Sequence, residues 1–415
     1  MFQFSSPLRA AKYVGLLGLV LPWVAYADMV DDSQLSLTAR NLYLNRNFTN
    51  KNPEFSKIGN WSQGLDLQFK SGYSDTPLAV GLDVDGQYAL RLDAHGNDGS
   101  LPYNPMTEKT AKDYSRAGAT LKMRYSKTEL KVGDYKPFLP VASNDPSRQL
   151  DTIYQGLVLE SKELDNLTLT GGRFWSAVTR QSSDHEPFYR NGTSNSDSSK
   201  GLDFAGATYS FLPNLEATYF YGVMHDLYQQ HYAGLKQTQD LGGGYSLKTE
   251  LGYFNNSNDG DARGGTVDNR SYSGSMSVSK NGHLVGVAYE RMLGDTGYPI
   301  INGYIPQPFL PNFAGLGFWN AGERSWSVRY GYNFATLGIP GLALLARYIK
   351  GTDIDRGAGL ADGSESERDV WATYVVQTGP LKGLSFDFKN IHVQQQYGND
   401  YDEFRLATSY TWRFW

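Results

Sequence analysis

The sequence predicts an all-β protein, a transmembrane antiparallel β-barrel of about 18 strands. Three features of the 415-residue chain predict this fold class: a secretory signal at its start, two-residue alternation of apolar and polar side chains, and tight turns that alternate with long polar loops. After the signal, no apolar run reaches the ~20 residues that a spanning helix needs. Abundant Tyr, Phe and Gly, with a mean hydropathy of −0.47, is typical of many strands and turns.

The first 27 residues have the three parts of a signal peptide. Arg9 and Lys12 precede an apolar run over residues 13–24, and Ala25-Tyr26-Ala27 forms a small-residue cleavage site before Asp28. The apolar run is too short to span a membrane as a helix. The sequence therefore predicts a signal peptide over residues 1–27 and one barrel domain over residues 28–415, without linkers or a plug domain.

Charge and residue usage exclude several function classes. The net charge of −5 offers no basic footprint for nucleic acid. The chain has no cysteine, and its six histidines are scattered, so we expect neither a zinc site nor another cofactor. An enzyme would need a Ser/His pair or paired acids near one face of the barrel, and the sequence offers no such pair that we can name. Loop 255–265 is rich in Asn and Asp, which could bind calcium, but it lacks EF-hand spacing and acidic loop tips are usually just solvated.

Two-residue alternation recurs along the chain and marks strands with one apolar and one polar face. Leu65, Leu67 and Phe69, for example, alternate with polar residues. The same pattern occurs in six segments: LDLQFKS, TLKMRY, LEATYFYGV, SLKTELGY, SWSVRYGYNF and LSFDFKN. A soluble sandwich or propeller could share this pattern. Strands of 9–11 residues with aromatic side chains at their ends favour a membrane barrel, where the apolar face meets lipid.

Loop lengths support the same architecture. Tight turns containing Gly, Pro, Asn or Asp alternate with long polar stretches at residues 182–200, 255–270 and 293–324. Short turns at one rim and long loops at the other are typical of outer-membrane barrels. A spanning strand needs about 9–11 residues, and a strand with its share of two connections takes roughly 21. The 388 residues after the predicted signal peptide therefore give about 18 strands.

The last strand explains how the barrel closes. Phe404, Leu406, Tyr410 and Trp412 share one face, which lipid would cover. We expect this strand to pair with the first one, near residues 35–48, so that no sheet edge remains open.

Several stretches resemble the OprD family of substrate-specific outer-membrane porins. They are SRAGATLKMRYSKTELKVGDYKPFLPV (115–141), LTLTGGR (167–173), GDTGYP (294–299), YGYNFATLGIPGLALLARYIKGTDID (330–355), SERDVWATYVVQTGPLKGL (366–384) and DEFRL (402–406). The resemblance extends from about Leu35 to the last strand. It implies a monomeric 18-stranded pore in the outer membrane of a Gram-negative bacterium, narrowed by an inward-folded third loop. It also implies a basic ladder, a series of cationic side chains in the lumen that draws carboxylates inward.

The resemblance also implies roles for particular residues. Arg148 in Asn144-Asp145-Pro146-Ser147-Arg148 matches the constriction arginine of the third loop, and Asp145 its acidic companion; the family is often one residue tighter here. A guanidinium suits this role because it stays charged and forks onto a carboxylate. Further ladder candidates, which could instead pair with lumen acids, are Arg180, Arg46, Arg124, Lys122, Arg329, Arg347, Lys389, Arg405 and Arg413. Arg173 would reach the lumen only if Gly171 and Gly172 formed a bulge.

The sequence predicts the solute less directly than it predicts the fold. The apolar, aromatic segment 306–319 would suit a benzoate-like ring, so we expect small aromatic carboxylates. A channel for basic amino acids and peptides and an unselective diffusion porin are the alternatives. The expected partners are the carboxylate solute, outer-membrane lipid and the barrel assembly machinery, with the protein as a monomer or loose trimer.

Overall fold

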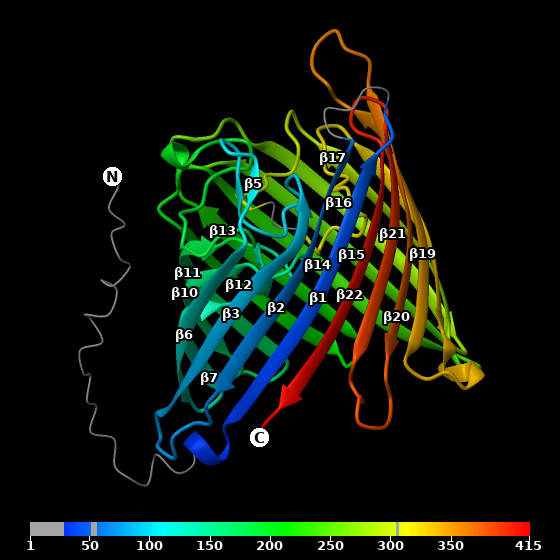
Figure 1. Ribbon diagram of the computed structural model, residues 1–415. Coiled ribbons are helices and arrows are strands. Elements are labelled where there is room, and N and C mark those ends of the chain that lie inside the picture. Colours follow the sequence, from blue (N-terminus) through cyan, green and yellow to red (C-terminus); the bar gives the residue numbers. More distant parts are fainter. Residues whose placement is uncertain (1–28, 51–55, 304–306) are drawn as a thin grey trace, which may run out of the picture.

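The computed structural model describes residues 29–50, 56–303 and 307–415. The predicted signal peptide lies outside the described residues, as does Pro306 of the aromatic segment. Eighteen long strands form one closed antiparallel barrel (Figure 1), and β22 pairs with β1 to complete it. The predicted fold class is therefore confirmed. No helix in the described part of the chain is long and apolar enough to cross a membrane.

Each long strand pairs with its neighbours in sequence order. The barrel strands are β1 Gln34–Phe48, β2 Lys57–Lys70, β3 Ala79–His95, β6 Asp113–Tyr125, β7 Thr128–Tyr135, β10 Ile153–Ser161, β11 Leu167–Val178, β12 Leu202–Leu212, β13 Leu215–Met224, β14 Tyr228–Gly242, β15 Tyr245–Asn258, β16 Asp268–Lys280, β17 His283–Leu293, β18 Arg324–Asn333, β19 Leu342–Ile354, β20 Gly363–Val375, β21 Ser385–Gln395 and β22 Tyr401–Arg413.

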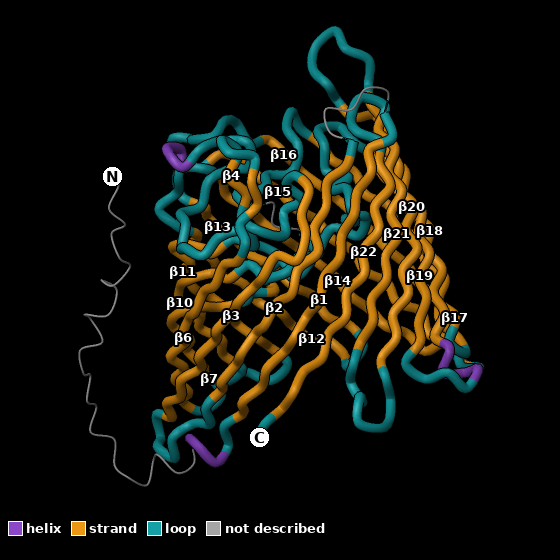
Figure 2. Tube along the Cα trace, viewed as in Figure 1, coloured by secondary structure: helices purple, strands orange, loops and turns teal. Residues whose placement is uncertain are grey.

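Short elements occupy the connections. Two small hairpins and two short 3₁₀ helices lie there: β4 Tyr103–Asn104 with β5 Lys109–Thr110, β8 Phe138–Leu139 with β9 Ala142–Ser143, η1 Asn195–Asp197 and η2 Phe334–Leu337. Long loops gather at one rim and tight turns at the other, where the C-terminus also lies (Figure 2). We name four loops at the long-loop rim: L2 (residues 96–112), L3 (136–152), L4 (179–201) and L7 (294–323). This is the extracellular rim in outer-membrane barrels.

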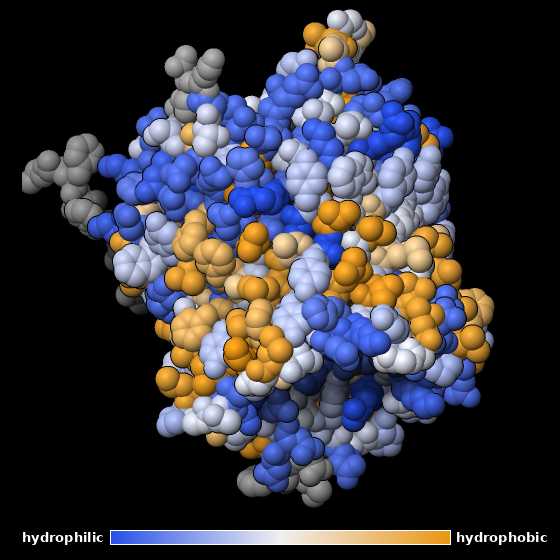
Figure 3. All heavy atoms as spheres, turned by 90° about the vertical axis from the view of Figure 1, so that its right-hand side faces the viewer, coloured by the Kyte–Doolittle hydropathy of each residue, from blue (hydrophilic) through white to orange (hydrophobic). Residues whose placement is uncertain are grey.

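The alternation sorts the side chains as predicted. On β18, Trp326, Val328 and Tyr330 are 45–47% exposed on the outer surface, whereas Ser325 and Ser327 are buried toward the lumen. Figure 3 shows an apolar band across one outer face, with hydrophilic residues above and below. The apolar band matches the lipid-facing belt of a membrane barrel.

One predicted loop is shorter than expected. β15 continues to Asn258 and β16 begins at Asp268, so the loop spans residues 259–267 rather than 255–270. Asn256 is buried and donates to Asn269 at 3.0 Å. Asn256 faces the lumen, whereas Asn255 and Ser257 lie on the outer face at the extracellular end of β15. Both faces are polar here, and the composition therefore resembles that of a loop.

Candidate functional site

L3 folds against the inside of the wall, where three contacts hold it. Arg40 Nη1 of β1 donates to the Arg148 carbonyl at 2.9 Å. Ser62 Oγ donates to Gln149 Oε1 at 2.9 Å, and Gln149 Nε2 returns a bond to the Arg40 carbonyl at 3.1 Å. The Gln149 amide lies so close to Gly64 that a side chain there would collide with it. These contacts position the loop that carries Arg148.

Arg148 is held by loop backbone rather than by a carboxylate. Its Nε donates to the Asp98 carbonyl of L2 at 3.1 Å, and its Nη1 bonds Ser147 at 3.1 and 3.2 Å. Among the described residues, no Asp or Glu forms an ion pair with it at 4.0 Å or less. Burial lowers the pKa of Arg148, and Arg405 and Arg180 lower it further, but the guanidinium stays charged at neutral pH.

Asp145 partners Arg180 instead. Arg180 Nη1 of L4 contacts Asp145 Oδ2 at 2.6 Å. Burial alone would raise the pKa of Asp145, but Arg180 and the Ser147 N–H hold it below its ordinary value. Asp145 therefore stays ionised and joins L4 to L3 beside Arg148.

A cavity of about 320 Å³ brings four of the predicted cations together. Arg148 and Arg180 line it from the loops, and Lys389 and Arg405 line it from the wall. Lys389 of β21 lies directly opposite Arg405 of β22 in the strand register. We call this space the central cavity.

Aromatic and apolar groups line the rest of the central cavity. Phe138 comes from L3, Phe313 from L7 and Trp371 from β20. Lys389 Nζ lies 4.4 Å from the centre of the Trp371 ring, and Arg347 Cζ lies 5.0 Å from it. Both distances are those of cation–π contacts. Among the described residues, Lys389 forms no carboxylate ion pair.

Two further ladder candidates face the lumen in ion pairs. Arg46 contacts Glu403 at 2.6 Å, and Glu403, which is fully buried, also binds Arg405. Arg347 contacts Asp369 at 2.6 and 2.9 Å. Both pairs reduce the charge that these arginines present to a solute.

The remaining candidates lie away from the central cavity. Arg329 faces Arg347 across the β18–β19 register. Lys122 contacts Asp83 at 2.7 Å, and Arg124 lies 4.2 Å from the Tyr73 ring, toward the short-turn rim. Arg413 is exposed near the end of β22.

Arg173 points outward. The register shift in the β10–β11 pair lies between Gln155 and Gly156, not at the Gly171-Gly172 pair. The Arg173 side chain is 42% exposed and contacts Asp203 at 3.3 Å, so the condition for lumen access is not met.

Sequence reasoning missed several lumen cations, among them Arg40, Arg116 and Lys136. Arg40 shares its face with Arg46, and Arg116 shares its face with Lys122, so parity could have found both. Arg116 Nε donates to Gln87 at 2.7 Å and its Nη1 to the L4 carbonyl of Thr179 at 2.9 Å, which fixes that loop. Lys136 is a loop residue, and no strand pattern pointed to it.

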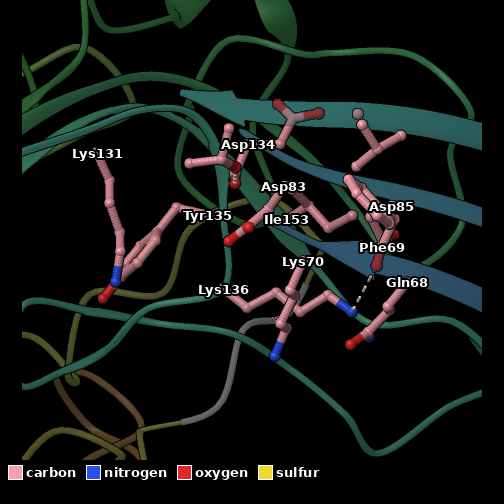
Figure 4. Close-up of a pocket in the computed structure, with 13 residues that line it drawn as sticks. Gln68, Phe69, Lys70, Asp83, Asp85, Lys131, Asp134, Tyr135, Lys136 and Ile153 are labelled. Carbon is pink, nitrogen blue, oxygen red and sulfur yellow. Dashed lines mark hydrogen bonds and ion pairs between the residues drawn. The ribbon is translucent and has the colours of Figure 1, made fainter. Parts of the chain in front are cut away.

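Lys136 crosses a second cavity, of about 240 Å³ (Figure 4). Its Nζ lies 3.2 to 3.6 Å from carboxylate oxygens of Asp66, Asp85 and Asp151. Burial opposes the charge, but these acids raise the pKa of Lys136 above its ordinary value. The acids are thus already bound to a resident cation.

No group of three or more His, Asp or Glu side chains in the described ranges is arranged to hold a metal ion. In loop 255–265, Asp261 pairs with Arg263 at 3.1 Å. The calcium hypothesis has no support from these contacts.

Comparison with known proteins identifies the family. A model described as "outer membrane porin, OprD family" matches residues 27–414. The chain is 36% identical over 402 residues to a porin-like protein, GalP, from Pseudomonas putida, covering 95% of each chain.

Solved structures are similar over the same span. A BenF-like porin from Pseudomonas fluorescens superposes with a TM-score of 0.89 at 35% identity, and OpdK from Pseudomonas aeruginosa, solved with vanillate, with 0.87 at 33%. Each comparison covers 93% of this chain and 100% of the solved one. The chain therefore belongs to the OprD family of outer-membrane porins, substrate-specific channels of the Gram-negative outer membrane.

Proposed function

We propose that this porin admits small aromatic carboxylates of the benzoate type. The central cavity carries the proposal, because it places cations and aromatic rings around one space. Arg148 and Lys389 have no carboxylate ion pair among the described residues, so each can bind a solute carboxylate. Phe138, Phe313 and Trp371 offer surfaces for the ring.

The route follows the basic ladder. Arg405 lies opposite Lys389, and Arg329 opposite Arg347, so cations recur across neighbouring strands of one wall. A carboxylate passes from one cation to the next, bound firmly enough to enter and weakly enough to leave. The protein as a whole is negatively charged, and anion selection therefore comes from local placement.

Related proteins support an aromatic solute. OpdK was solved with vanillate, which is an aromatic carboxylate, and another similar structure is described as BenF-like. The alternative of basic amino acids needs free acids for the cationic group. Asp66, Asp85 and Asp151 surround Lys136, which makes that alternative weaker.

The test is benzoate flux into liposomes that contain the parent, Arg148→Ala or Arg173→Ala. Arg148→Ala loses a charged hydrogen bond of about 1.5–3 kcal/mol, which predicts a fall of roughly 10- to 150-fold in affinity for the solute. Benzoate flux through this variant should therefore be slower than through the parent. Arg173→Ala removes an outward arginine and should transport like the parent.

Salt provides a second criterion. The screening length falls from ~10 Å at 0.1 M salt to ~3 Å at 1 M. The difference in benzoate flux between the parent and Arg148→Ala should therefore shrink as salt rises. Equal benzoate flux through Arg148→Ala and the parent at low salt would refute the ladder mechanism and favour an unselective porin.

A further inference from the structure

Four adjacent strands carry the same outward pair of residues, a cation and an aromatic ring two positions apart. The pairs are Arg270 with Tyr272 on β16, Arg291 with Tyr289 on β17, Arg324 with Trp326 on β18, and Lys350 with Tyr348 on β19. In every pair the cation lies nearer the extracellular rim. We call these four cations, together with Arg368 on β20, the outer cationic patch.

The aromatic rings mark the height of the patch relative to lipid. Tyr272, Tyr289 and Trp326 are 44–45% exposed above apolar residues of the outer face. Aromatic belts lie at the level of the lipid headgroups. Two residues span about 6.6 Å along a strand, or roughly 5 Å toward water at a ~45° tilt. The cations therefore reach the polar layer of the outer leaflet.

The patch holds more positive charge than its own acids neutralise. Asp268 lies 4.0 Å from Arg270, and Asp353 pairs with Arg324. Among the described residues, Arg291, Lys350 and Arg368 have no carboxylate ion pair; Arg368 donates to the Asn390 amide oxygen at 3.0 Å.

The strand register places like charges together. Arg291 lies directly opposite Arg324, and Lys350 lies opposite Trp326 on the next strand pair. Like charges opposite each other on one face of a sheet are destabilising. Asp353 pairs with Arg324 and also attracts Arg291, which offsets part of this repulsion. A further anion that bridges Arg291 and Arg324 would remove the rest.

We propose that the outer cationic patch binds the phosphate groups of lipopolysaccharide. The outer leaflet of this membrane is built from lipopolysaccharide, whose lipid A moiety carries phosphates at the headgroup level and acyl chains below. Arginine forks bind phosphate with two hydrogen bonds, and lysine binds it as a point charge. The apolar band and the rings below the patch would contact the acyl chains. This site is independent of the solute path, because it lies on the opposite face of the wall.

The experiment titrates the detergent-purified, delipidated barrel with bisphosphorylated lipid A and counts bound lipid by native mass spectrometry. Arg291→Gln/Lys350→Gln/Arg368→Gln should bind lipid A roughly a hundredfold more weakly than the parent, since each cation near an anionic surface contributes about fivefold. Monophosphorylated lipid A should bind the parent more weakly, and millimolar inorganic phosphate should not displace the lipid. Displacement by phosphate at that level would overturn the assignment to lipopolysaccharide.

The matched control is Lys280→Gln. Lys280 also faces outward on β16 beside an aromatic ring, 3.9 Å from the centre of Tyr245, but at the periplasmic end. It should bind lipid A like the parent. Unchanged affinity in the triple variant, or an equal loss in Lys280→Gln, would overturn the proposal. If the triple variant does not fold, Arg291→Gln and Lys350→Gln are tested singly, and about a fivefold loss in each is expected.

Discussion

The depth of each outward residue in the bilayer can be tested by placing arginine at two heights. Met276 on β16 is 49% exposed and lies four residues from both Tyr272 and Lys280. Four residues span about 13 Å along a strand, or roughly 9 Å along the membrane normal at a ~45° tilt. Met276 is therefore near the middle of the apolar band.

Met276→Arg should destabilise the barrel by about 2–4 kcal/mol, the cost of arginine at the bilayer midplane. Ser257→Arg is the control. Ser257 lies on the neighbouring strand β15, opposite Asp268 at the extracellular end, where the cost is about 0–1 kcal/mol. A difference of about 2–3 kcal/mol corresponds to a roughly 30- to 150-fold difference in the folding equilibrium constant.

The assay is urea unfolding in lipid vesicles, followed by the mobility of unheated samples on gels. The urea midpoint of Met276→Arg should fall well below that of Ser257→Arg. Coincident midpoints would show that the two positions do not differ in depth, and the placement of the apolar band would be wrong.

Three further predictions follow from particular contacts. Leu406→Arg should lower the folding yield in vesicles more than Phe404→Arg, because Leu406 lies two residues farther from the extracellular end of β22; equal yields would contradict this order. Burial next to Glu365 raises the pKa of Glu323 to about 8 from 4.5, so the native state retains a proton that the unfolded chain releases. The contact between Glu323, the last residue of L7, and Glu365 of β20 should therefore weaken as pH rises from about 4.5 to about 8, seen as faster proteolysis of L7, and Glu323→Gln should reduce the pH dependence. Trp371→Ala should lower flux of benzoate more than flux of acetate, since only the aromatic solute loses a ring contact; equal losses would exclude a role for this ring.

Strand alternation alone was sufficient to predict much of this protein. A period of two puts each side chain on a known face, and Arg46, Arg124, Arg329 and Arg405 share the inward parity of their strands. Their contact with the solute stays a prediction. The need to leave no sheet edge open predicted that the last strand would pair with the first. The face of a strand residue is a local feature, because it depends only on backbone geometry and on the contrast between lipid and water.

The composition of the central cavity depends on contacts between distant segments. Arg148 and Arg180 lie in loops, where no period applies, and they reach Lys389 and Arg405 only because Arg40, Ser62 and Asp98 fix the loops. The tertiary structure also decides which cations are neutralised. Glu403 of β22 pairs with Arg405 on its own strand and with Arg46 on β1, which is distant in sequence. Parity predicts the face of a side chain, whereas its ion pairs depend on how strands and loops meet across the lumen.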